Sequence, residues 1–438
     1  MAEIRPFAAL RYDPTRFGDL SDVLAPPYDV LDAAGKAKLQ ARSPYNIVGV
    51  DLPYLPPKAV GPDAVYADAA RTIADWTSAG VLKADALPAI YAYSQSFTVR
   101  GRTFDRRGMI ALVRIEEFST PAATTQVVPH EKTYKGPIED RMKLMQATGL
   151  QLSPIFGLFP DEGGALTGEL YSGLDQPQAA GTLDGVTSRI WPVTDPAKTT
   201  AIVGAMRSKK IYIADGHHRY TTALGYKKAL EAQLGHALPA DHPANFCLFV
   251  LVSMHDEGCV ILPTHRLVGG LSGFDVAALE AKLSGAFAVS EIPGDPSAMP
   301  AFEDGLATAP AGTFGLYDGA TKKMYTLTLT KPDLLAEFEP GQSPAWRSLD
   351  VAILRRYLLD EIIAPAFAGG KEPTLGYTAD PTQIAGAVDG TAYQIALLLR
   401  PTPLQALIDL GEHGEVMPQK STYFYPKLAT GVVMNPIA

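Results

Sequence analysis

Apolar and polar residues recur along this chain with two different periods, which predicts a mixture of helices and strands. Residues 64–79 place apolar side chains every three or four positions, a pattern typical of a helix that packs one face on a core. Residues 89–99 and 103–115 alternate as two strands do, and the Arg-Gly-Arg between them predicts a hairpin turn. Residues 244–253 are apolar almost throughout, which predicts a strand buried on both faces.

The segments between these elements carry signals for loops and helix ends. Tandem prolines predict an extended backbone over residues 24–30, because proline is excluded from helix interiors. Residues 160–188 are rich in Gly, Asp and Pro and lack apolar periodicity, so we expect an irregular excursion there. Residues 211–214 indicate a strand, and a helix is expected over residues 220–234, with Leu234 on its inner face.

The C-terminal part has elements of its own. Residues 313–317 and 323–330 predict a second hairpin, and Ser348 is the expected N-cap of a helix that follows it. Residues 391–399 indicate one more strand. Because strands and helices follow one another without strict alternation, we expect an α+β fold with mixed sheets.

Length and composition narrow the class of protein. A chain of 438 residues is too long for one small core, and we divide it into segments 1–118, 119–245 and 246–438. The net charge of −9 argues against nucleic acid as a partner, since binding to its backbone needs clustered Lys and Arg. The two cysteines, Cys247 and Cys259, match no zinc or redox spacing and are expected to be free thiols, which suits a reducing cytoplasm. We expect neither a signal peptide nor a membrane helix.

The strongest chemical signal is the segment Asp215-Gly216-His217-His218-Arg219, at the tip of the strand predicted over 211–214. A helix that starts there presents unpaired backbone N–H groups and a partial positive charge, which suits an anion. The histidines and the arginine add donors for phosphate oxygens, and Asp215 could hold a metal ion or orient a histidine. The alternative is that Asp215 only caps the helix while the histidines bond locally; five such residues together favour a site.

A second cluster, Pro129-His130-Glu131, follows an apolar stretch upstream. It is not the His-Glu-x-x-His of a zinc-protease helix, because position 134 is Tyr. Taken alone, a glutamate beside a histidine is more often a solvated loop pair. If Glu131 faces the Asp215 segment, however, its carboxylate is a natural general base for a substrate hydroxyl.

These motifs carry a resemblance to known families. The order Pro129-His130-Glu131, Pro154-Ile155 and then Asp215 to Arg219 resembles the ParB/sulfiredoxin superfamily, and within it the archaeal ADP-dependent free-serine kinases. The similarity covers about residues 120–235. Over its whole length, through stretches such as LAPPYDV, LPTHRL and MPQKSTYFYPK, the chain is similar to a large prokaryotic family catalogued as a domain of unknown function.

The resemblance implies a ParB/sulfiredoxin-like core, elaborated by N- and C-terminal segments. It implies Glu131 as catalytic base, Asp215 as a catalytic and metal-binding residue, and His130, His217, His218 and Arg219 as the residues that bind nucleotide phosphates. Sulfiredoxin chemistry is disfavoured, because His217 stands where a nucleophilic cysteine is needed. DNA partition is disfavoured too, since the corresponding ParB motif is arginine-rich.

Three further residues are candidates for the phosphate site. His265 and Arg266 are expected on a loop after the strand over 244–253, where an exposed cationic loop is an equally good interpretation. Lys420, in the Pro-bounded C-terminal segment, could reach a phosphate as a point charge. No P-loop or Rossmann glycine pattern occurs in the sequence.

The leading hypothesis is a small-molecule kinase that moves a phosphoryl group from ATP, ADP or pyrophosphate to a hydroxyl, with free serine as one candidate acceptor and Mg²⁺ as cofactor. Two alternatives stay open. One is a nucleotide-binding regulator without turnover. The other is a metal-dependent hydrolase with His130, Glu131, Asp215, His217 and His218 as ligands.

Overall fold

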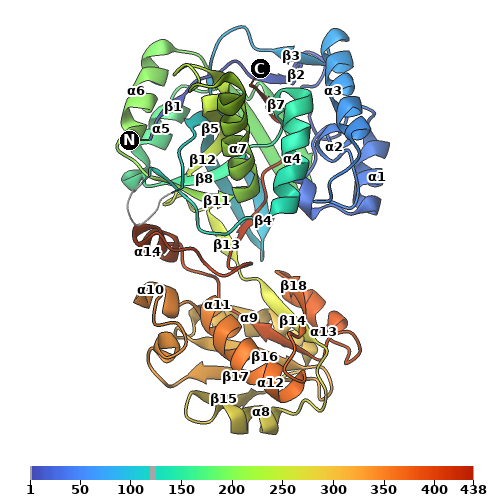
Figure 1. Ribbon diagram of the computed structural model, residues 1–438, viewed down its shortest axis with the longest axis vertical. Coiled ribbons are helices and arrows are strands. Elements are labelled where there is room, and N and C mark those ends of the chain that lie inside the picture. The colour runs from blue at the N-terminus through green and yellow to red at the C-terminus, as the bar shows by residue number, and fades with distance from the viewer. Residues whose placement is uncertain (1, 119–124, 438) are drawn as a thin grey trace. The chain divides into compact units, whose positions relative to one another are not determined.

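The computed structural model describes residues 2–118 and 125–437, so the first residues of the predicted segment 119–245 lie outside the described part. The chain forms two compact units, which we call unit 1 (Met1–Val260 and Pro426–Ala438) and unit 2 (Ile261–Tyr425). Unit 1 therefore contains both the N-terminal part of the chain and a C-terminal segment (Figure 1). This division differs from the three predicted segments, because strands on either side of positions 118 and 245 share one sheet.

A mixed sheet is the frame of unit 1. Among the described residues it has nine strands in the order β6-β11-β8-β12-β5-β4-β10-β9, with β1 added on β5. The strands are β1 (Ile4–Arg5), β4 (Ile90–Val99), β5 (Arg102–Arg114), β6 (Val127–Val128), β8 (Ile155–Phe159), β9 (Ala179–Leu183), β10 (Val186–Val193), β11 (Ile211–Asp215) and β12 (Phe246–Ser253). Strand β11 runs parallel to β6 and antiparallel to β8, while β12 runs parallel to β8. The short pairs β2 (Leu10–Tyr12) with β3 (Leu82–Ala84) and β7 (Leu150–Gln151) with β21 (Asn435–Pro436) complete the strands of this unit.

Helices cover this sheet, and two of them, α4 and α7, pack side by side (Figure 1). The helices of unit 1 are α1 (Ala33–Arg42), α2 (Val48–Asp51), α3 (Asp63–Ser78), α4 (Lys135–Thr148), α5 (Ala165–Tyr171), α6 (Pro196–Met206) and α7 (His217–Leu234), with short 3₁₀ turns η1 (Tyr28–Val30), η2 (Glu162–Gly164) and η3 (Pro243–Asn245).

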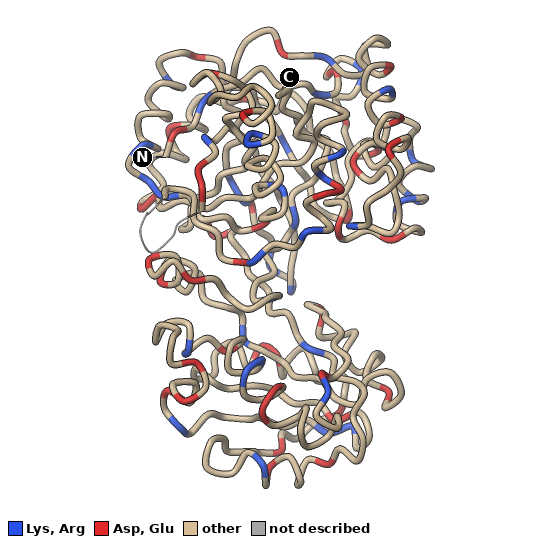
Figure 2. Tube along the Cα trace, viewed as in Figure 1, with Lys and Arg blue, Asp and Glu red and all other residues tan. Residues whose placement is uncertain are grey.

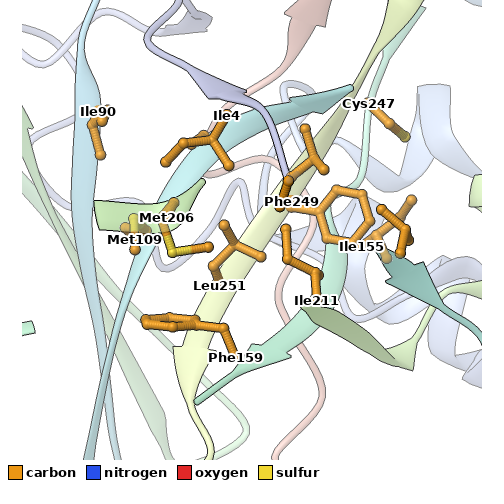
Figure 3. Close-up of a cluster of buried hydrophobic side chains, with 14 of the residues drawn as sticks. Ile4, Ile90, Met109, Ile155, Phe159, Met206, Ile211, Cys247, Phe249 and Leu251 are labelled. Atoms are coloured by element: carbon orange, nitrogen blue, oxygen red, sulfur yellow. The ribbon is translucent and has the colours of Figure 1, made fainter. Parts of the chain in front are cut away.

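The core of unit 1 is formed by apolar side chains from strands of the sheet and from the helices that cover it. Every residue of β12 is buried, and Phe249 and Leu251 on it pack with side chains from neighbouring strands and from α6 (Figure 3). The cluster reaches from Ile4 near the N-terminus to Ile437, so distant parts of the sequence bury apolar surface together. Burial of this kind contributes about 25 cal/mol per Å² of apolar surface, and it stabilises the part of the sheet that contains β8, β11 and β12.

Unit 2 is built on a six-stranded antiparallel sheet in the order β15-β17-β16-β19-β14-β18. Its strands are β14 (His265–Gly269), β15 (Phe287–Ile292), β16 (Thr313–Asp318), β17 (Lys323–Leu329), β18 (Thr374–Thr378) and β19 (Ile395–Leu398). Its helices are α8 (Val276–Leu283), α9 (Met299–Thr308), α10 (Pro344–Arg347), α11 (Asp350–Ile353), the π-helix η6 (Leu354–Ile363), α12 (Ala364–Phe367), α13 (Ile384–Ala387) and α14 (Gln405–His413), with 3₁₀ turns η4 (Pro296–Ala298), η5 (Leu334–Ala336) and η7 (Pro381–Gln383). Strands β13 (Val260–Leu262) and β20 (Tyr423–Tyr425) form a separate pair.

The α+β class, both hairpins and the buried strand β12 are confirmed. Helix α3 buries one face, as its apolar spacing predicts. Cys247 and Cys259 are free, and burial raises the pKa of each thiol to about 12, so both are protonated thiols at neutral pH.

Four local predictions are wrong. The expected irregular excursion over 160–188 contains α5 and β9. The extended segment over 24–30 ends in a 3₁₀ turn over Tyr28–Val30, since the prolines restrict the backbone only up to Pro27. Leu234 is 52% exposed, because α7 extends beyond the sheet. Ser348 caps no helix; Ser343 caps α10 instead by accepting a hydrogen bond from Trp346.

The charged residues are distributed over the whole chain. Lys and Arg positions alternate with Asp and Glu positions in each unit (Figure 2). Within the residues that the structure describes, no helix is both long and apolar enough to cross a bilayer.

Candidate functional site

The start of α7 is shaped by one glycine. Strand β11 ends at Asp215, and Gly216 turns the backbone into the helix with φ of 95°, a left-handed conformation that disfavours residues with a side chain. A Cβ at position 216 would also lie 3.0 to 3.1 Å from the guanidinium of Arg219. No side chain caps this end of α7, so its positive end faces whatever binds beyond Asp215.

Asp215 holds two cations at this strand tip. Its Oδ2 accepts a hydrogen bond from Arg219 Nη2 at 2.7 Å, and its Oδ1 accepts one from Lys427 Nζ at 2.5 Å. Arg219 also donates Nη1 to the carbonyl of Pro154. The Pro154-Ile155 motif therefore contributes a backbone acceptor that holds the arginine in place.

Lys427 comes from the C-terminal segment of unit 1, 212 positions after Asp215. The fully buried Arg106 fixes the backbone there by donating Nη2 to the carbonyl of Pro426 at 2.7 Å, and Gln95 Nε2 donates to the carbonyl of Lys427 at 3.3 Å. The sequence pointed to Lys420 and missed Lys427. The signal available was the strand-tip carboxylate itself, which needs cationic partners when it is largely buried.

The two histidine motifs meet face to edge. The backbone N–H of His130 donates to His217 Nε2 at 3.2 Å, and the two rings lie 4.5 Å apart at nearly right angles. His130 Nδ1 donates to the carbonyl of Ile213 at 2.6 Å, which ties the Pro-His-Glu segment to strand β11. These contacts bring together two stretches of chain that lie 87 positions apart.

Glu131 lies at the helix start as a result. Its Oε2 is 4.0 Å from Nδ1 of His217, and 34% of its side chain is exposed. Because His217 Nε2 accepts a hydrogen bond, the proton of the neutral ring is on Nδ1, on the side of Glu131. His218 accepts from the backbone N–H of Tyr134 at 3.1 Å, and its ring stacks on that of Tyr134.

Burial sets the charge state of these groups. Burial lowers the pKa of His130 and of His218 and lowers that of His217 well below its ordinary value of 6.5, so neutral imidazoles line the site. Burial alone would raise the pKa of Asp215, but the charges of Lys427 and Arg219 outweigh it and lower that pKa, so the carboxylate is ionised. The site thus combines neutral N–H donors with a cation pair held by one carboxylate.

This arrangement does not fit the predicted role of Asp215 as a metal ligand. Both of its oxygens already accept bonds from cations, and a metal ion would have to displace Lys427 or Arg219. One ring nitrogen of each histidine likewise has a backbone hydrogen-bond partner: His130 Nδ1, His217 Nε2 and His218 Nε2. Within residues 2–118 and 125–437, no three His, Cys, Asp or Glu side chains are grouped so as to hold a metal.

His265, Arg266 and Lys420 belong to unit 2. The predicted loop is wrong for the first two, which lie buried on β14. His265 bonds Glu303 Oε1 through Nε2 at 3.0 Å and accepts from the backbone N–H of Leu399, while Arg266 donates to the carbonyls of Thr264 and Gln419. Their part in a phosphate site stays a prediction, and their bonds within unit 2 are of the kind that stabilise a core.

The family of this chain is shown by a sequence comparison. The model of a family described as protein of unknown function (DUF1015) matches residues 4–352, and the chain belongs to that family. This confirms the resemblance to a family of unknown function over residues 4–352, and the MPQKSTYFYPK stretch lies beyond the match. No curated protein matches the chain.

Some solved structures are distantly similar. A free serine kinase in complex with AMP is 12% identical, with 73% of this chain and 98% of that chain covered and a TM-score of 0.30. SbnI with a C-terminal truncation, from Staphylococcus aureus, is 11% identical, with 74% of this chain and 86% of that chain covered and a TM-score of 0.34. A conserved hypothetical protein from Pyrococcus furiosus is 14% identical, with 70% of this chain and 92% of that chain covered and a TM-score of 0.29. Likeness at this level carries no conclusion about the activity of this chain.

Proposed function

We propose that this protein is a phosphotransferase that moves a phosphoryl group from ATP, ADP or pyrophosphate to the hydroxyl of a small molecule, with free serine as a candidate acceptor. The observation that carries the proposal is the approach of Glu131 to the start of α7, 4.0 Å from His217. A carboxylate and an anion-binding helix start that face one substrate are the two parts that phosphoryl transfer to a hydroxyl needs.

The terminal phosphoryl group of the donor would lie against the start of α7. The N–H groups of His217 and His218 and the positive helix end would bind its oxygens, and Arg219 and Lys427 would supply positive charge next to them. Asp215 would orient these two cations and is a positioning residue in this proposal.

Glu131 would accept the proton of the substrate hydroxyl. The hydroxyl oxygen then forms the new bond to phosphorus as the bond from phosphorus to the leaving phosphate oxygen breaks, and the proton on Glu131 passes to water. The partial exposure of Glu131, 34% of its side chain, gives that proton a path to solvent. Mg²⁺ in such a reaction would reach the site on the donor phosphates, since Asp215 does not fit as its ligand.

The test is transfer of labelled phosphate to serine and related small hydroxy compounds with ATP, ADP and pyrophosphate in turn. We expect Glu131→Gln to lower the rate by about 10²- to 10⁴-fold, the usual contribution of a general base, with donor affinity unchanged. The matched control is Glu117→Gln, which removes an exposed glutamate paired with Lys228. Equal rates for wild type and Glu131→Gln, or no transfer from any donor, would contradict the proposal.

A further inference from the structure

A small cavity in unit 1 lies next to the Asp215 site. Its volume is about 40 Å³, and its lining includes the charged residues Asp51, Arg141 and Arg219 together with the polar residues Tyr28, Gln151, Ser153 and Thr222. Arg219 also bonds Asp215, so a single side chain separates this cavity from the start of α7. Apolar residues of α4 and of the segment after it, among them Leu144 and Leu152, form the remaining wall.

Asp51 is the unusual member of this lining. It ends helix α2 and is only 3% exposed. Its Oδ1 accepts hydrogen bonds from Arg141 Nη1 at 3.2 Å and from Ser153 Oγ at 3.1 Å. Among the described residues, no group donates a hydrogen bond to its Oδ2. A buried carboxylate oxygen without a donor costs free energy, so a donor from a ligand would be bound well there.

The cations around Asp51 have further acceptors besides Asp51 Oδ1. Arg141 donates Nε and Nη2 to Asp140 Oδ2 at 2.9 and 2.7 Å, and its Nη1 donates to the carbonyl of Asp51 at 2.6 Å. Arg219 is paired with Asp215. Arg141 is therefore shared by two carboxylates, Asp140 and Asp51, while Arg219 is held by Asp215, so the Oδ2 atom of Asp51 is the acceptor that a ligand can meet.

We propose that this cavity binds the primary ammonium group of a small hydroxylated amine, with Asp51 Oδ2 as its acceptor. A volume of about 40 Å³ holds a group of about one or two heavy atoms, since one water takes about 30 Å³ in the liquid. Burial raises the pKa of Asp51 against the opposing charge of Arg141, and a cationic donor would restore the ionised form. The identity of the acceptor that this suggests, an amino alcohol or hydroxy amino acid, rests on the proposed function; the binding does not.

The experiment is a calorimetric titration of the full chain, without any phosphoryl donor, using ethanolamine and its neutral isostere ethylene glycol. We expect ethanolamine to bind at least about tenfold more tightly than ethylene glycol, because a charge-assisted hydrogen bond to a buried carboxylate contributes that much. Asp51→Asn should remove this preference. Equal binding of the two compounds, or no binding of ethanolamine to folded wild type, overturns the proposal.

Asp140→Asn is the matched control. It takes a carboxylate from the same Arg141 but does not line the cavity, so the ethanolamine preference should survive in it. If both variants fail to fold, the comparison of the two compounds on wild type still decides. Transfer assays separate the two proposals. Equally fast phosphorylation of serine and glycerate would contradict the ammonium site but support the phosphotransferase. Ethanolamine binding without any transfer would support the ammonium site but contradict the phosphotransferase.

Discussion

Each unit of this chain contains a buried histidine next to a glutamate, and the two pairs differ in what surrounds them. In unit 2, His265 is bonded to Glu303 at 3.0 Å, and both side chains are buried at 1% exposure or less. In unit 1, His217 lies 4.0 Å from Glu131, and one third of that glutamate side chain is exposed at an uncapped helix start. The first pair is closed within a core, whereas the second faces solvent.

A histidine beside a carboxylate therefore indicates a reactive site only when the carboxylate can reach a substrate. The sequence alone does not separate the two pairs, because His265 and Glu131 each belong to a short polar motif that comes after an apolar stretch. The difference arises from the sheet: β14 lies inside its sheet, between β18 and β19, whereas Glu131 follows the edge strand β6. Four changes test this contrast, from the largest expected effect to the smallest.

His265→Ala should destabilise the protein strongly without changing the chemistry of unit 1. The substitution leaves Glu303 buried without its imidazole partner, which costs about 3 kcal/mol of unfolding free energy. Urea denaturation measures this loss. Glu131→Gln is the counterpart and should cost less than about 1 kcal/mol, since its side chain is partly solvated. Similar losses in both variants would remove the distinction between the two pairs.

Lys427→Met should lower phosphoryl transfer by about 100-fold, because it removes one of the two cations held by Asp215 at the start of α7. The steady-state rate and the donor affinity measure this together. Lys420→Met, at the position favoured by sequence alone, should leave both unchanged. The assignment of Lys427 fails if Lys420→Met has the larger effect.

Gly216→Ala and Gly235→Ala compare the two ends of α7. Both glycines have positive φ, 95° and 74°, so either alanine should cost about 1 kcal/mol in thermal or urea unfolding. Only the alanine at 216 meets the Arg219 guanidinium, while nothing lies within 4 Å of a Cβ at 235. We therefore expect Gly216→Ala alone to weaken donor binding. Equal donor affinities in the two variants would show that the close approach of Arg219 to residue 216 does not matter.

Acidification should weaken the fold through His217. Its folded pKa lies well below the ordinary value of 6.5, so below pH 6.5 the unfolded chain binds more protons than the folded one. The stabilisation is present above pH 6.5 and is lost progressively as the pH falls from 6.5 toward the lower folded pKa. The urea midpoint at pH 7.5 and 5.5 measures it, and His217→Gln should reduce the slope, with His130 and His218 contributing the remainder. An unchanged slope in that variant would assign the pH dependence to other groups.

Much of the fold could be predicted because local patterns decide it. The continuous apolar run of residues is almost sufficient to predict the buried strand β12. The turn at Arg100-Gly101, whose residues have φ of 50° and 73°, is almost sufficient to predict the hairpin of β4 and β5. Where the prediction failed, tertiary contacts decided. Helix α5 forms in the Gly-rich stretch because Leu166 and Leu170 pack into the core. The carboxylate of Asp161 also accepts hydrogen bonds from the backbone N–H groups of Leu166 and Thr167 in its first turn.

Only those site residues that belong to short, contiguous motifs could be predicted from the sequence. The expectation that the Pro-His-Glu and Asp-Gly-His-His-Arg segments lie together agrees with the contacts of His130 with His217. Asp51 and Lys427 carry no such local signal, because each reaches the site from another part of the chain. The two cations on Asp215 likewise depend on a pairing across 212 positions, which a single sequence does not reveal.

The late position of Lys427 in the sequence has a consequence for biosynthesis. Ribosomes make Asp215 and Arg219 long before Lys427, and domains can begin to fold while synthesis continues. The ion pair between Asp215 and Lys427 therefore cannot form until the segment after Tyr425 has emerged from the exit tunnel. If the start of α7 binds an anion as proposed, the full positive charge of that site exists only after the segment that carries Lys427 has been made.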